Sequence, residues 1–359
     1  MGEPLPNRLL ALLLPLLLAL ACTTQPSQPT PTPTAAGSPT GTPQPTPTAA
    51  ISSPPGASPT ATPSTPPSSS PSPTASPTPT ATPTLPTAYD AAALDAELGR
   101  LLGRQRARYS IPGLSAAVLM PDGHAWSTGA GFASLEQERP ARGDTPFVVG
   151  SISKTFITAL VMQLAAEGTL SLDDRLAEWL PDYARHNDAT LRQLLAHTSG
   201  IYNYFEHPQY NRRVFGEPSH AWTPREIVTE FAAPPYFAAG SGYHYSNTGF
   251  ILLGLVIERA TGGALEDELA RRLLDPLALT GTHFQGAGPP PSESAQGYLV
   301  GPNGPRLVSD DSGYRPTRSA ATVAWAAGAI ASTAADLATW ARSLYGGGVV
   351  QPEFLAQMT

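Results

Sequence analysis

A proline-rich tract from Thr23 to Thr87 sets the first limit on how this chain can fold. The tract contains 20 of the chain's 41 prolines, no charged residue, no Trp and no Tyr, and it is otherwise almost entirely Thr, Ser and Ala. A segment of this composition cannot bury enough apolar surface to offset the entropy lost on ordering. Because repeated Pro-Thr and Pro-Ser steps favour the extended polyproline II conformation, residues 22–87 are predicted to form a disordered tether. Folding is then left to residues 88–359.

The residues before the tract are typical of a secretory signal. Arg8 precedes an apolar run from Leu9 to Ala21, which is shorter than the about 20 residues that a membrane-spanning helix needs. The segment that ends at Cys22 resembles a bacterial lipobox, and Cys22 is the only cysteine, so it has no partner for an internal disulfide. We therefore expect a signal peptide at residues 1–21 and a lipid on Cys22 that anchors an extracytoplasmic protein to the cell envelope. Ordinary signal cleavage and secretion is the alternative.

The rest of the chain has the composition of a single large globular domain. All five Trp, all twelve Tyr and all ten Phe lie in residues 88–359, and the net charge of the chain is −7. This acidic balance argues against nucleic acid or an anionic membrane surface as a partner. The seven histidines show no His-Glu-x-x-His or Cys/His spacing, so we expect no metal site and no cofactor.

Hydrophobic periodicity predicts both strands and helices in this domain. A helix over Asp90–Arg108 is followed by a strand over Leu114–Met120, a turn at Pro121–Gly123 and a return strand over His124–Ala133. Further along, the pattern becomes mostly helical. The elements expected there are a short helix over Leu191–Ala196, an irregular aromatic-rich loop over Ile201–Phe215, and helices over Thr248–Ala260, Leu265–Leu274 and Ala334–Tyr345, the last with Thr333 and Asp336 as a capping box.

The segment Phe147–Phe156 predicts a short buried strand, a glycine turn and a first helical turn that carries Ser151 and Lys154. Residues three apart on a helix lie on one face with about 5–6 Å between their Cβ atoms, so a hydroxyl is placed beside an amine. Lys154 is the only lysine, whereas the chain contains 20 arginines. Arg stays protonated at any usable pH, but a desolvated Lys can act as a base. The pattern favours a serine activated without a histidine, although Ser-x-x-Lys also arises by chance in a Ser-rich chain.

Three segments together resemble the serine β-lactamase and penicillin-binding superfamily, and most closely its class C-like branch, which also holds DD-peptidases and esterases. They are Gly150–Lys154, Leu195–Ile201 with its His-Thr-Ser-Gly sequence, and Tyr245–Asn247. Near the end, Ala327–Leu337 is similar to the segment before a surface helix in that branch. The resemblance covers essentially all of residues 88–359. It implies an α/β (α+β) fold, in which an antiparallel sheet flanked by helices joins a mostly helical lobe.

The resemblance also implies a role for each site residue. Ser151 is expected to be the nucleophile, Lys154 and Tyr245 to move its proton, and Asn247 to hold the substrate's amide. These roles agree with general chemistry, since a serine hydroxyl is a weak nucleophile until a neighbour accepts its proton. An ammonium beside a phenol favours the phenolate, so Tyr245 is expected to act as a base near neutral pH. The backbone N–H of Ser151 would stabilise the developing oxyanion.

Simpler interpretations exist for some of these residues. Tyr245 can be a packed loop aromatic, and Asn247 can be the N-cap of the helix that starts at Thr248. His197 suggests a Ser–His–Asp triad, but no Gly-x-Ser-x-Gly sequence occurs in the chain. A His at a helix C-terminus more often contacts backbone carbonyls or the helix dipole, so a structural role is expected for His197.

The third motif of the family is not found in the sequence. The family has Lys, His or a similar residue, then a small residue, then Gly, on a strand that walls the pocket. Here Leu279-Thr280-Gly281 has no basic residue and comes too early. The resemblance therefore implies that the later sheet strands are missing and that the chain is C-terminally incomplete. The N-terminal hairpin is then expected to have an unpaired edge, and this chain to be poorly stable and poorly active.

These features predict an extracytoplasmic serine hydrolase that acts through an acyl-enzyme on amide or ester substrates. The resemblance implies D-Ala-D-Ala peptides, β-lactams or small esters, so the expected partners are small molecules or peptidoglycan peptides. No Glu-x-x-x-Asn loop of the class A type is seen between the second and third motif regions, and no residue indicates the fast deacylation of a dedicated β-lactamase. The alternative is a non-catalytic module that binds envelope peptides or penicillin without turnover.

Overall fold

The computed structural model describes residues 89–183 and 188–358. The expected signal peptide, the lipidation site at Cys22 and the proline-rich tether lie outside the described residues. The mixed helix and strand content agrees with the expected α/β class, and the strands form two three-stranded sheets and one two-stranded hairpin.

The first sheet is an antiparallel hairpin with one added strand. Strands β1 (Gly113–Leu119) and β2 (Ala125–Ser134) pair along their length, and β3 (Arg139–Pro140) extends the sheet in the order β1-β2-β3. The predicted hairpin is therefore confirmed, with its strand boundaries shifted by one residue. Among the described residues, β1 pairs only with β2.

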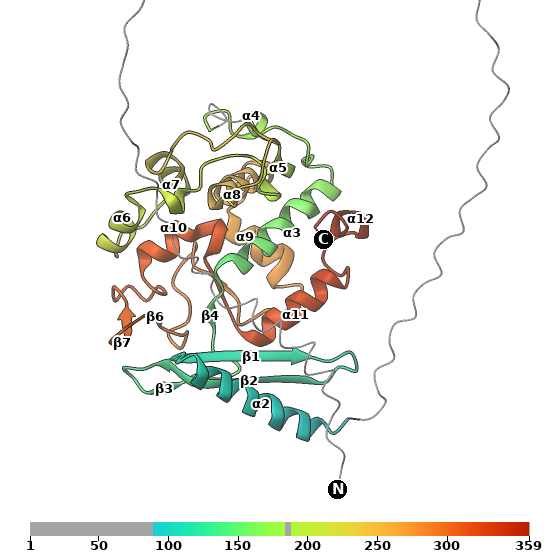
Figure 1. The fold of residues 1–359 in the computed structure, drawn as a ribbon. Coiled ribbons are helices and arrows are strands. Elements are labelled where there is room, and N and C mark those ends of the chain that lie inside the picture. The colour runs from blue at the N-terminus through green and yellow to red at the C-terminus, as the bar shows by residue number, and fades with distance from the viewer. Residues whose placement is uncertain (1–88, 184–187, 359) are drawn as a thin grey trace, which may run out of the picture. The chain divides into compact units, whose positions relative to one another are not determined.

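Helices cover both faces of this sheet. Helix α2 (Ala91–Arg108) begins where the Asp90 side chain accepts a hydrogen bond from the backbone N–H of Ala93, so the expected start is confirmed. In Figure 1, α2 lies below the hairpin and α11 (Ala334–Tyr345) lies above it, against β1. Thr333 caps α11 by accepting from the N–H of Asp336, whereas the Asp336 carboxylate accepts from Gly281 and Thr282 instead of closing the capping box.

The second sheet joins segments that lie far apart in the sequence. Its order is β4 (Phe147–Val148), β8 (Ile330–Ser332) and β5 (His283–Phe284), with antiparallel pairing throughout. Strand β4 was expected to be buried, but it is only two residues long and the Val148 side chain is 38% exposed. The third sheet is the hairpin β6 (Gly297–Gly301) and β7 (Gly304–Val308).

The core of the domain lies where three helices of the helical lobe pack together. These are α3 (Ser153–Ala166), α8 (Asn247–Thr261) and α10 (Arg318–Gly328). Full burial of each large aliphatic or aromatic side chain contributes about 1.5–3 kcal/mol, so this contact stabilises the position of α3 strongly. Core side chains from the three helices include Phe156, Ile157, Leu160, Ile251, Leu253, Ile257 and Val323.

Shorter helices complete the lobe. Helix α8 ends at Gly262, whose φ of +72° is the left-handed cap that glycine adopts without steric cost. The expected helix over Leu265–Leu274 is an α-helical turn, α9 (Leu265–Leu269), that continues as the π-helical segment Ala270–Leu274. The remaining helices are α4 (Leu176–Trp179), α5 (Leu191–Leu195), α6 (Tyr210–Gly216), α7 (Pro224–Glu230), α12 (Pro352–Leu355) and the 3-10 turns Gly150–Ile152 and Tyr204–Glu206.

The segment Ile201–Phe215 was expected to be an irregular loop, and this expectation is wrong in part. It contains the 3-10 turn Tyr204–Glu206 and the start of α6. The Tyr204 ring is 1% exposed, and its hydroxyl donates a hydrogen bond to the carbonyl of Val323 at 2.6 Å. A buried aromatic anchor therefore orders this segment against α10.

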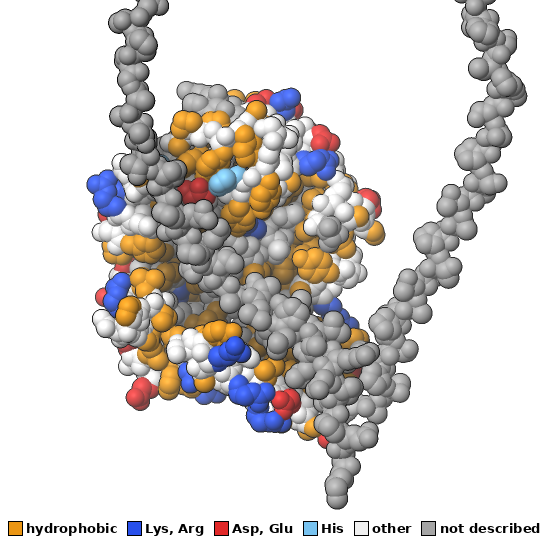
Figure 2. All heavy atoms as spheres, viewed as in Figure 1, with side chains coloured by type: hydrophobic (Ala, Val, Ile, Leu, Met, Phe, Trp, Pro, Cys, Tyr) orange, Lys and Arg blue, Asp and Glu red, His pale blue; other side chains and the backbone are white. Residues whose placement is uncertain are grey.

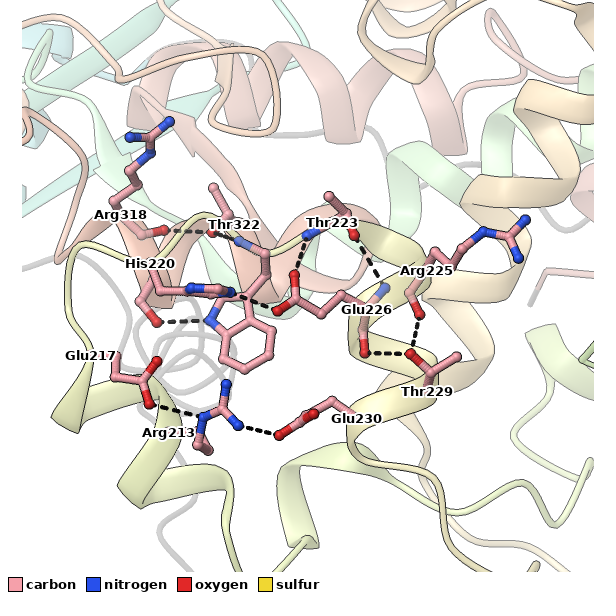
Figure 3. Close-up of polar contacts among 12 residues, drawn as sticks. Arg213, Glu217, His220, Thr223, Arg225, Glu226, Thr229, Glu230, Arg318 and Thr322 are labelled. Atoms are coloured by element: carbon pink, nitrogen blue, oxygen red, sulfur yellow. Dashed lines mark hydrogen bonds and ion pairs between the residues drawn. The ribbon is translucent and has the colours of Figure 1, made fainter.

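Helices α6, α7 and α10 meet around the buried side chain of Trp222. Its indole N–H donates to Ser319 Oγ at 2.8 Å, and its backbone N–H donates to Thr322 Oγ1 at 3.0 Å. Figure 3 shows the charged residues of this region, in which Arg213 lies between the carboxylates of Glu217 and Glu230. We call this region the Trp222 corner, and its residues are Arg213, Glu217, His220, Trp222, Glu226 and Glu230.

The surface carries both signs of charge. On the face shown in Figure 2, blue and red side chains are interspersed with hydrophobic groups, and several blue side chains lie close together near the lower edge. Among the described residues, no single helix is both long and apolar enough to cross a membrane. Helix α8 and the segment Leu265–Leu274, joined by an 83° bend, reach that length and apolarity only as a pair.

Candidate active site

Ser151 lies in the 3-10 turn that joins β4 to helix α3. Gly150 opens this turn with a φ of +52°, a left-handed conformation that disfavours any residue with a Cβ atom. The sequence placed Ser151 inside the first α-helical turn, whereas α3 begins at Ser153. The consequence is that Ser151 is exposed at the turn while Lys154, one turn further, is only 6% exposed.

Strand β8 fixes the position of this turn. The backbone N–H of Val149 donates to the carbonyl of Ile330 at 2.9 Å, and the N–H of Ile330 donates to Ser153 Oγ at 3.1 Å. On the other side of α3, the Trp340 indole donates to Thr155 Oγ1 at 2.9 Å. Sequence reasoning missed Ser153, because nothing in a Ser-rich chain marks one hydroxyl as the partner of a strand almost 180 positions away.

Three neutral oxygens surround the Lys154 amine. Nζ lies 3.1 Å from Ser151 Oγ, 2.8 Å from Asn247 Oδ1 and 2.5 Å from the carbonyl oxygen of Ala327. The rings of Tyr245 and Phe250 lie beside it, with their centroids 5.2 and 5.3 Å from Nζ. The expected contact between the serine and the lysine is therefore present, and the Ala327 carbonyl is a partner that side-chain patterns cannot reveal.

Burial controls the charge of this amine. Loss of water around Lys154 disfavours the ammonium and lowers its pKa from 10.5 to about 7. None of its three hydrogen-bond partners is a carboxylate that would restore the charged form. A substantial share of the molecules therefore carries a neutral amine at neutral pH, which is the form that can accept a proton.

Tyr245 reaches the same serine from the loop before α8. Its hydroxyl lies 2.8 Å from Ser151 Oγ. The expectation that Tyr245 is a phenolate near neutral pH is wrong. Burial raises the pKa of Tyr245, and the opposing effect of its hydrogen bond to Ser151 is smaller. A phenol whose pKa lies above its ordinary value of 10 keeps its proton near neutral pH.

His197 contacts the loop that carries Tyr245. It follows α5 with a φ of +57°, its Nδ1 accepts a hydrogen bond from the backbone N–H of Ser246 at 3.2 Å, and its ring lies 4.3 Å from the Tyr245 ring. The expected contact with helix carbonyls is thus replaced by a contact with the Tyr-Ser-Asn segment. Burial and the nearby charge of Lys154 lower the pKa of His197 to about 4, so its ring is neutral near pH 7.

Asn247 is the first residue of α8, and its side chain does not cap that helix. The N-cap position belongs to Ser246, so the alternative interpretation of Asn247 is wrong. Its Oδ1 faces Lys154, while its backbone N–H and its Nδ2 both donate to Asn203 Oδ1 at 3.1 Å. No sequence pattern marks Asn203 as a partner of Asn247, because it lies in the segment Ile201–Phe215 and the two residues meet only through tertiary packing.

Leu279-Thr280-Gly281 lies in the turn before β5, where the N–H of Gly281 donates to the Asp336 carboxylate at 2.9 Å, at the start of α11. Among the residues that the structure describes, no group of three or more His, Cys, Asp or Glu side chains is placed to hold a metal ion.

Comparison with known proteins gives matches of both sequence and fold. Residues 98–359 match the family model described as Beta-lactamase. Penicillin-binding protein 4* of Bacillus subtilis (strain 168) is 29% identical over 157 residues, which cover 42% of this chain and 33% of that protein. Esterase EstB of Burkholderia gladioli is 33% identical over 212 residues, which cover 56% of this chain and 54% of that protein. The chain thus spans between about a third and about half the length of these curated relatives.

A solved structure shares the fold. A D-stereospecific amidohydrolase from Streptomyces sp. superposes with a TM-score of 0.63 at 32% identity, and the match covers 76% of this chain and 77% of that chain. The resemblance inferred from the three sequence segments, and the fold that it implied, are confirmed by these matches.

Proposed function

Because the chain belongs to the beta-lactamase family, we propose that it hydrolyses amide or ester substrates through an acyl-enzyme formed on Ser151. The relatives include proteins named as a penicillin-binding protein, an esterase and a D-stereospecific amidohydrolase. These names describe attack on a carbonyl group or binding of an acylating agent. Acyl transfer to a serine is the step that such proteins can share.

One observation carries this proposal, namely the hydrogen bonding of the Lys154 amine. A neutral amine has two N–H groups and one lone pair. The Asn247 side-chain oxygen and the Ala327 carbonyl can only accept hydrogen bonds, so they take the two N–H groups. The lone pair is then left facing Ser151 Oγ at 3.1 Å, and it can accept the hydroxyl proton as the serine attacks.

Tyr245 completes the proton path in this proposal. Attack forms a bond between Ser151 Oγ and the substrate carbonyl carbon, and the hydroxyl proton passes to Lys154. The Tyr245 hydroxyl lies 2.8 Å from the same oxygen, so it can return a proton to the leaving group as the bond to that group breaks. Acylation leaves a phenolate on Tyr245 and an ammonium on Lys154. Water then replaces Ser151 as the nucleophile and gives a proton to the Tyr245 phenolate, and the Lys154 ammonium returns its proton to Ser151 Oγ as the acyl–oxygen bond breaks. The Ser151 backbone N–H would donate to the oxyanion in both steps.

The chemistry of the site and the names of its relatives support a substrate class. We propose amides and esters, among them D-Ala-D-Ala peptides, penicillins and small esters. Asn247 keeps one Nδ2 hydrogen beyond its bond to Asn203, and this hydrogen can donate to the substrate's amide.

The proposal for the cellular location depends on the N-terminal sequence. We propose that Cys22 carries a lipid and that residues 22–87 tether the catalytic domain to the outer face of a membrane. The test is a detergent phase separation after expression in a bacterium that processes lipoproteins. In it, Cys22→Ser should move the protein from the detergent phase to the aqueous phase. An unchanged partition would contradict the anchor.

Covalent labelling tests the enzymatic proposal directly. The full chain is incubated with a fluorescent penicillin and, separately, with a p-nitrophenyl ester, a D-Ala-D-Ala peptide and a D-amino acid amide. We expect a covalent adduct on Ser151 and hydrolysis of at least one substrate, both absent in Ser151→Ala. Exposure of Ser151 makes this variant a mild structural change.

The outcome also separates the enzyme from the non-catalytic alternative. An adduct that forms but does not turn over would favour a module that binds penicillin without hydrolysis. Neither label nor hydrolysis above the Ser151→Ala level would contradict the acyl-enzyme proposal altogether.

A further inference from the structure

Asn247 is hydrogen-bonded to a second amide side chain, that of Asn203, which in turn is hydrogen-bonded to the carboxylate of Glu206. Asn203 is 5% exposed, and its Oδ1 accepts both the backbone N–H and the side-chain Nδ2 of Asn247. Its own Nδ2 donates to Glu206 Oε1 at 3.0 Å. Glu206, Asn203, Asn247 and Lys154 therefore form a continuous series of hydrogen bonds that ends at Ser151.

The direction of this series is fixed from both ends. A backbone N–H can only donate, so the N–H of Asn247 requires the oxygen of Asn203 on its side. The Glu206 carboxylate can only accept while it is ionised, so it requires the nitrogen of Asn203 on the other side. Asn203 is thus held in one of its two amide orientations, and through its oxygen it holds Asn247 Nδ2 away from Lys154.

We infer that Asn203 and Glu206 are positioning residues of the catalytic site, which orient the Asn247 amide so that its oxygen faces Lys154. The inference rests on the proposed function and adds two residues to it. In the opposite orientation, Asn247 Nδ2 would point at Nζ and donate to the lone pair of the neutral amine. The lone pair would then be occupied and unable to accept the Ser151 proton.

The groups around the series set its electrostatics. At its outer end, Glu206 Oε2 accepts from the Tyr236 hydroxyl at 2.7 Å and lies 3.7 Å from His244 Nε2, and the Tyr236 hydroxyl in turn accepts from the N–H of Asn203. The His244 ring stacks on Tyr236 with centroids 3.8 Å apart. At the inner end, the titratable groups beside Lys154 are Tyr245 and His197.

Exchange of the amide and the carboxylate offers a sharp test. Asn203→Asp removes the donor to Glu206 and places two carboxylates in contact, one of them close to Asn247. Adding Glu206→Gln to that variant restores an N–H donor, which now points from residue 206 to residue 203. The matched control is Glu226→Gln in the Trp222 corner, where the carboxylate also accepts side-chain and backbone hydrogen bonds but belongs to helix α7.

Two readouts are measured on the full chain with each variant. The first is the rate of acylation by fluorescent penicillin as a function of pH. The second is the titration of the Lys154 side chain by NMR after incorporation of isotope-labelled lysine, which gives a single side-chain signal because the chain has one lysine. A purely structural contribution to folding would change the melting temperature but would not move this titration.

We expect Asn203→Asp to slow acylation about tenfold or more at neutral pH and to raise the Lys154 midpoint by about one pH unit, because a negative charge is placed nearer the amine. Adding Glu206→Gln to Asn203→Asp should raise the acylation rate several-fold above pH 7. Glu206→Gln alone should lower the acylation rate by less than about threefold, since the amide oxygen of the new side chain can still accept a hydrogen bond from Asn203. Glu226→Gln should match the wild type in both readouts.

The inference is overturned if Asn203→Asp acylates at the wild-type rate with an unchanged Lys154 midpoint, or if Glu206→Gln gives no recovery in the Asn203→Asp chain. If Asn203→Asp does not fold, Glu206→Ala replaces it, and a wild-type rate and midpoint in that variant overturn the inference. The proposed function is judged separately, because it fails only if the wild type is not acylated on Ser151. The NMR titration still tests the positioning residues in that case.

Discussion

The Ser151 site and the Trp222 corner are built from the same kinds of groups but hold their cations differently. In the corner, the Arg213 guanidinium lies over the Trp222 ring and pairs with the carboxylates of Glu217 and Glu230. In the site, the Lys154 amine lies beside two aromatic rings, but its partners are a hydroxyl, an amide oxygen and a backbone carbonyl.

This difference explains why one cluster is suited to structure and the other to chemistry. Carboxylates stabilise a charged partner, and a guanidinium stays charged at any usable pH, so Arg213 can link helices but cannot exchange protons. Burial instead lowers the pKa of Lys154 to about 7, and none of its neutral hydrogen-bond partners is a carboxylate that would restore the charge, so the amine can gain or lose a proton. The identity of the partners, rather than the presence of a cation among aromatic rings, decides the role.

Exchange of the two cations should give the largest effect. Lys154→Arg puts a permanently protonated group beside Ser151, and loss of the general base should slow acylation about 100- to 10,000-fold. The measurement is the rate of labelling by fluorescent penicillin, with Arg213→Lys as the matched control. We expect Arg213→Lys to label at the wild-type rate. Rapid labelling of Lys154→Arg would show that Lys154 acts only through its charge.

The pH dependence of acylation tests the state of the amine. A base must be unprotonated to accept a proton, so the rate should rise as the pH increases through about 7 and then level off. Two pH units below that midpoint, the neutral fraction and the rate should be about 100-fold lower. A rate that still rises steeply between about pH 8 and pH 10 would mean that Lys154 keeps the pKa of an exposed lysine.

Asn247→Asp makes the site resemble the corner by giving the lysine a carboxylate partner. The new ion pair should favour the ammonium and raise the pKa of Lys154, so acylation near neutral pH should fall about 10- to 100-fold. Part of the loss should be recovered at higher pH, because the amine can still be deprotonated there. A loss of the same size at every pH would indicate that Asn247 acts by binding substrate alone.

Trp222→Phe should change stability without changing the chemistry. The variant removes the indole N–H that donates to Ser319, a residue with 0% exposure, and leaves a small cavity. We expect a loss of about 1–3 kcal/mol in the free energy of unfolding, measured by thermal denaturation. Labelling of the folded protein by penicillin should keep its rate. A slower labelling rate at an unchanged melting temperature would mean that the Trp222 corner affects catalysis, and it would contradict a purely structural role for the corner.

Much of the fold could be predicted because its signals are local. The hairpin of β1 and β2 follows from alternation around one turn, and α11 begins where Thr333 caps it, as its sequence indicates. The contact of Ser151 with Lys154 follows from a spacing of three residues across the start of one helix. In each case, the interacting residues belong to one element or to two adjacent ones.

The protonation of the site could not be predicted in the same way. An isolated Lys-Tyr pair suggests a phenolate, but burial raises the pKa of Tyr245 and lowers that of Lys154. Burial depends on how α3, α8 and α10 pack, and no short sequence pattern carries that information. Asn203 was missed for a related reason, because its importance comes only from its contact with Asn247.

Local sequence is enough to predict which hydroxyl and which amine lie side by side, because a helical turn brings residues three apart together whatever surrounds it. The protonation state of that amine, in contrast, depends on tertiary packing. Its two acceptors come from residues 93 and 173 positions away, and its water is excluded by side chains from separate helices. Desolvation and the choice of partner are properties of the assembled core, and they alone separate a reactive lysine from a structural one.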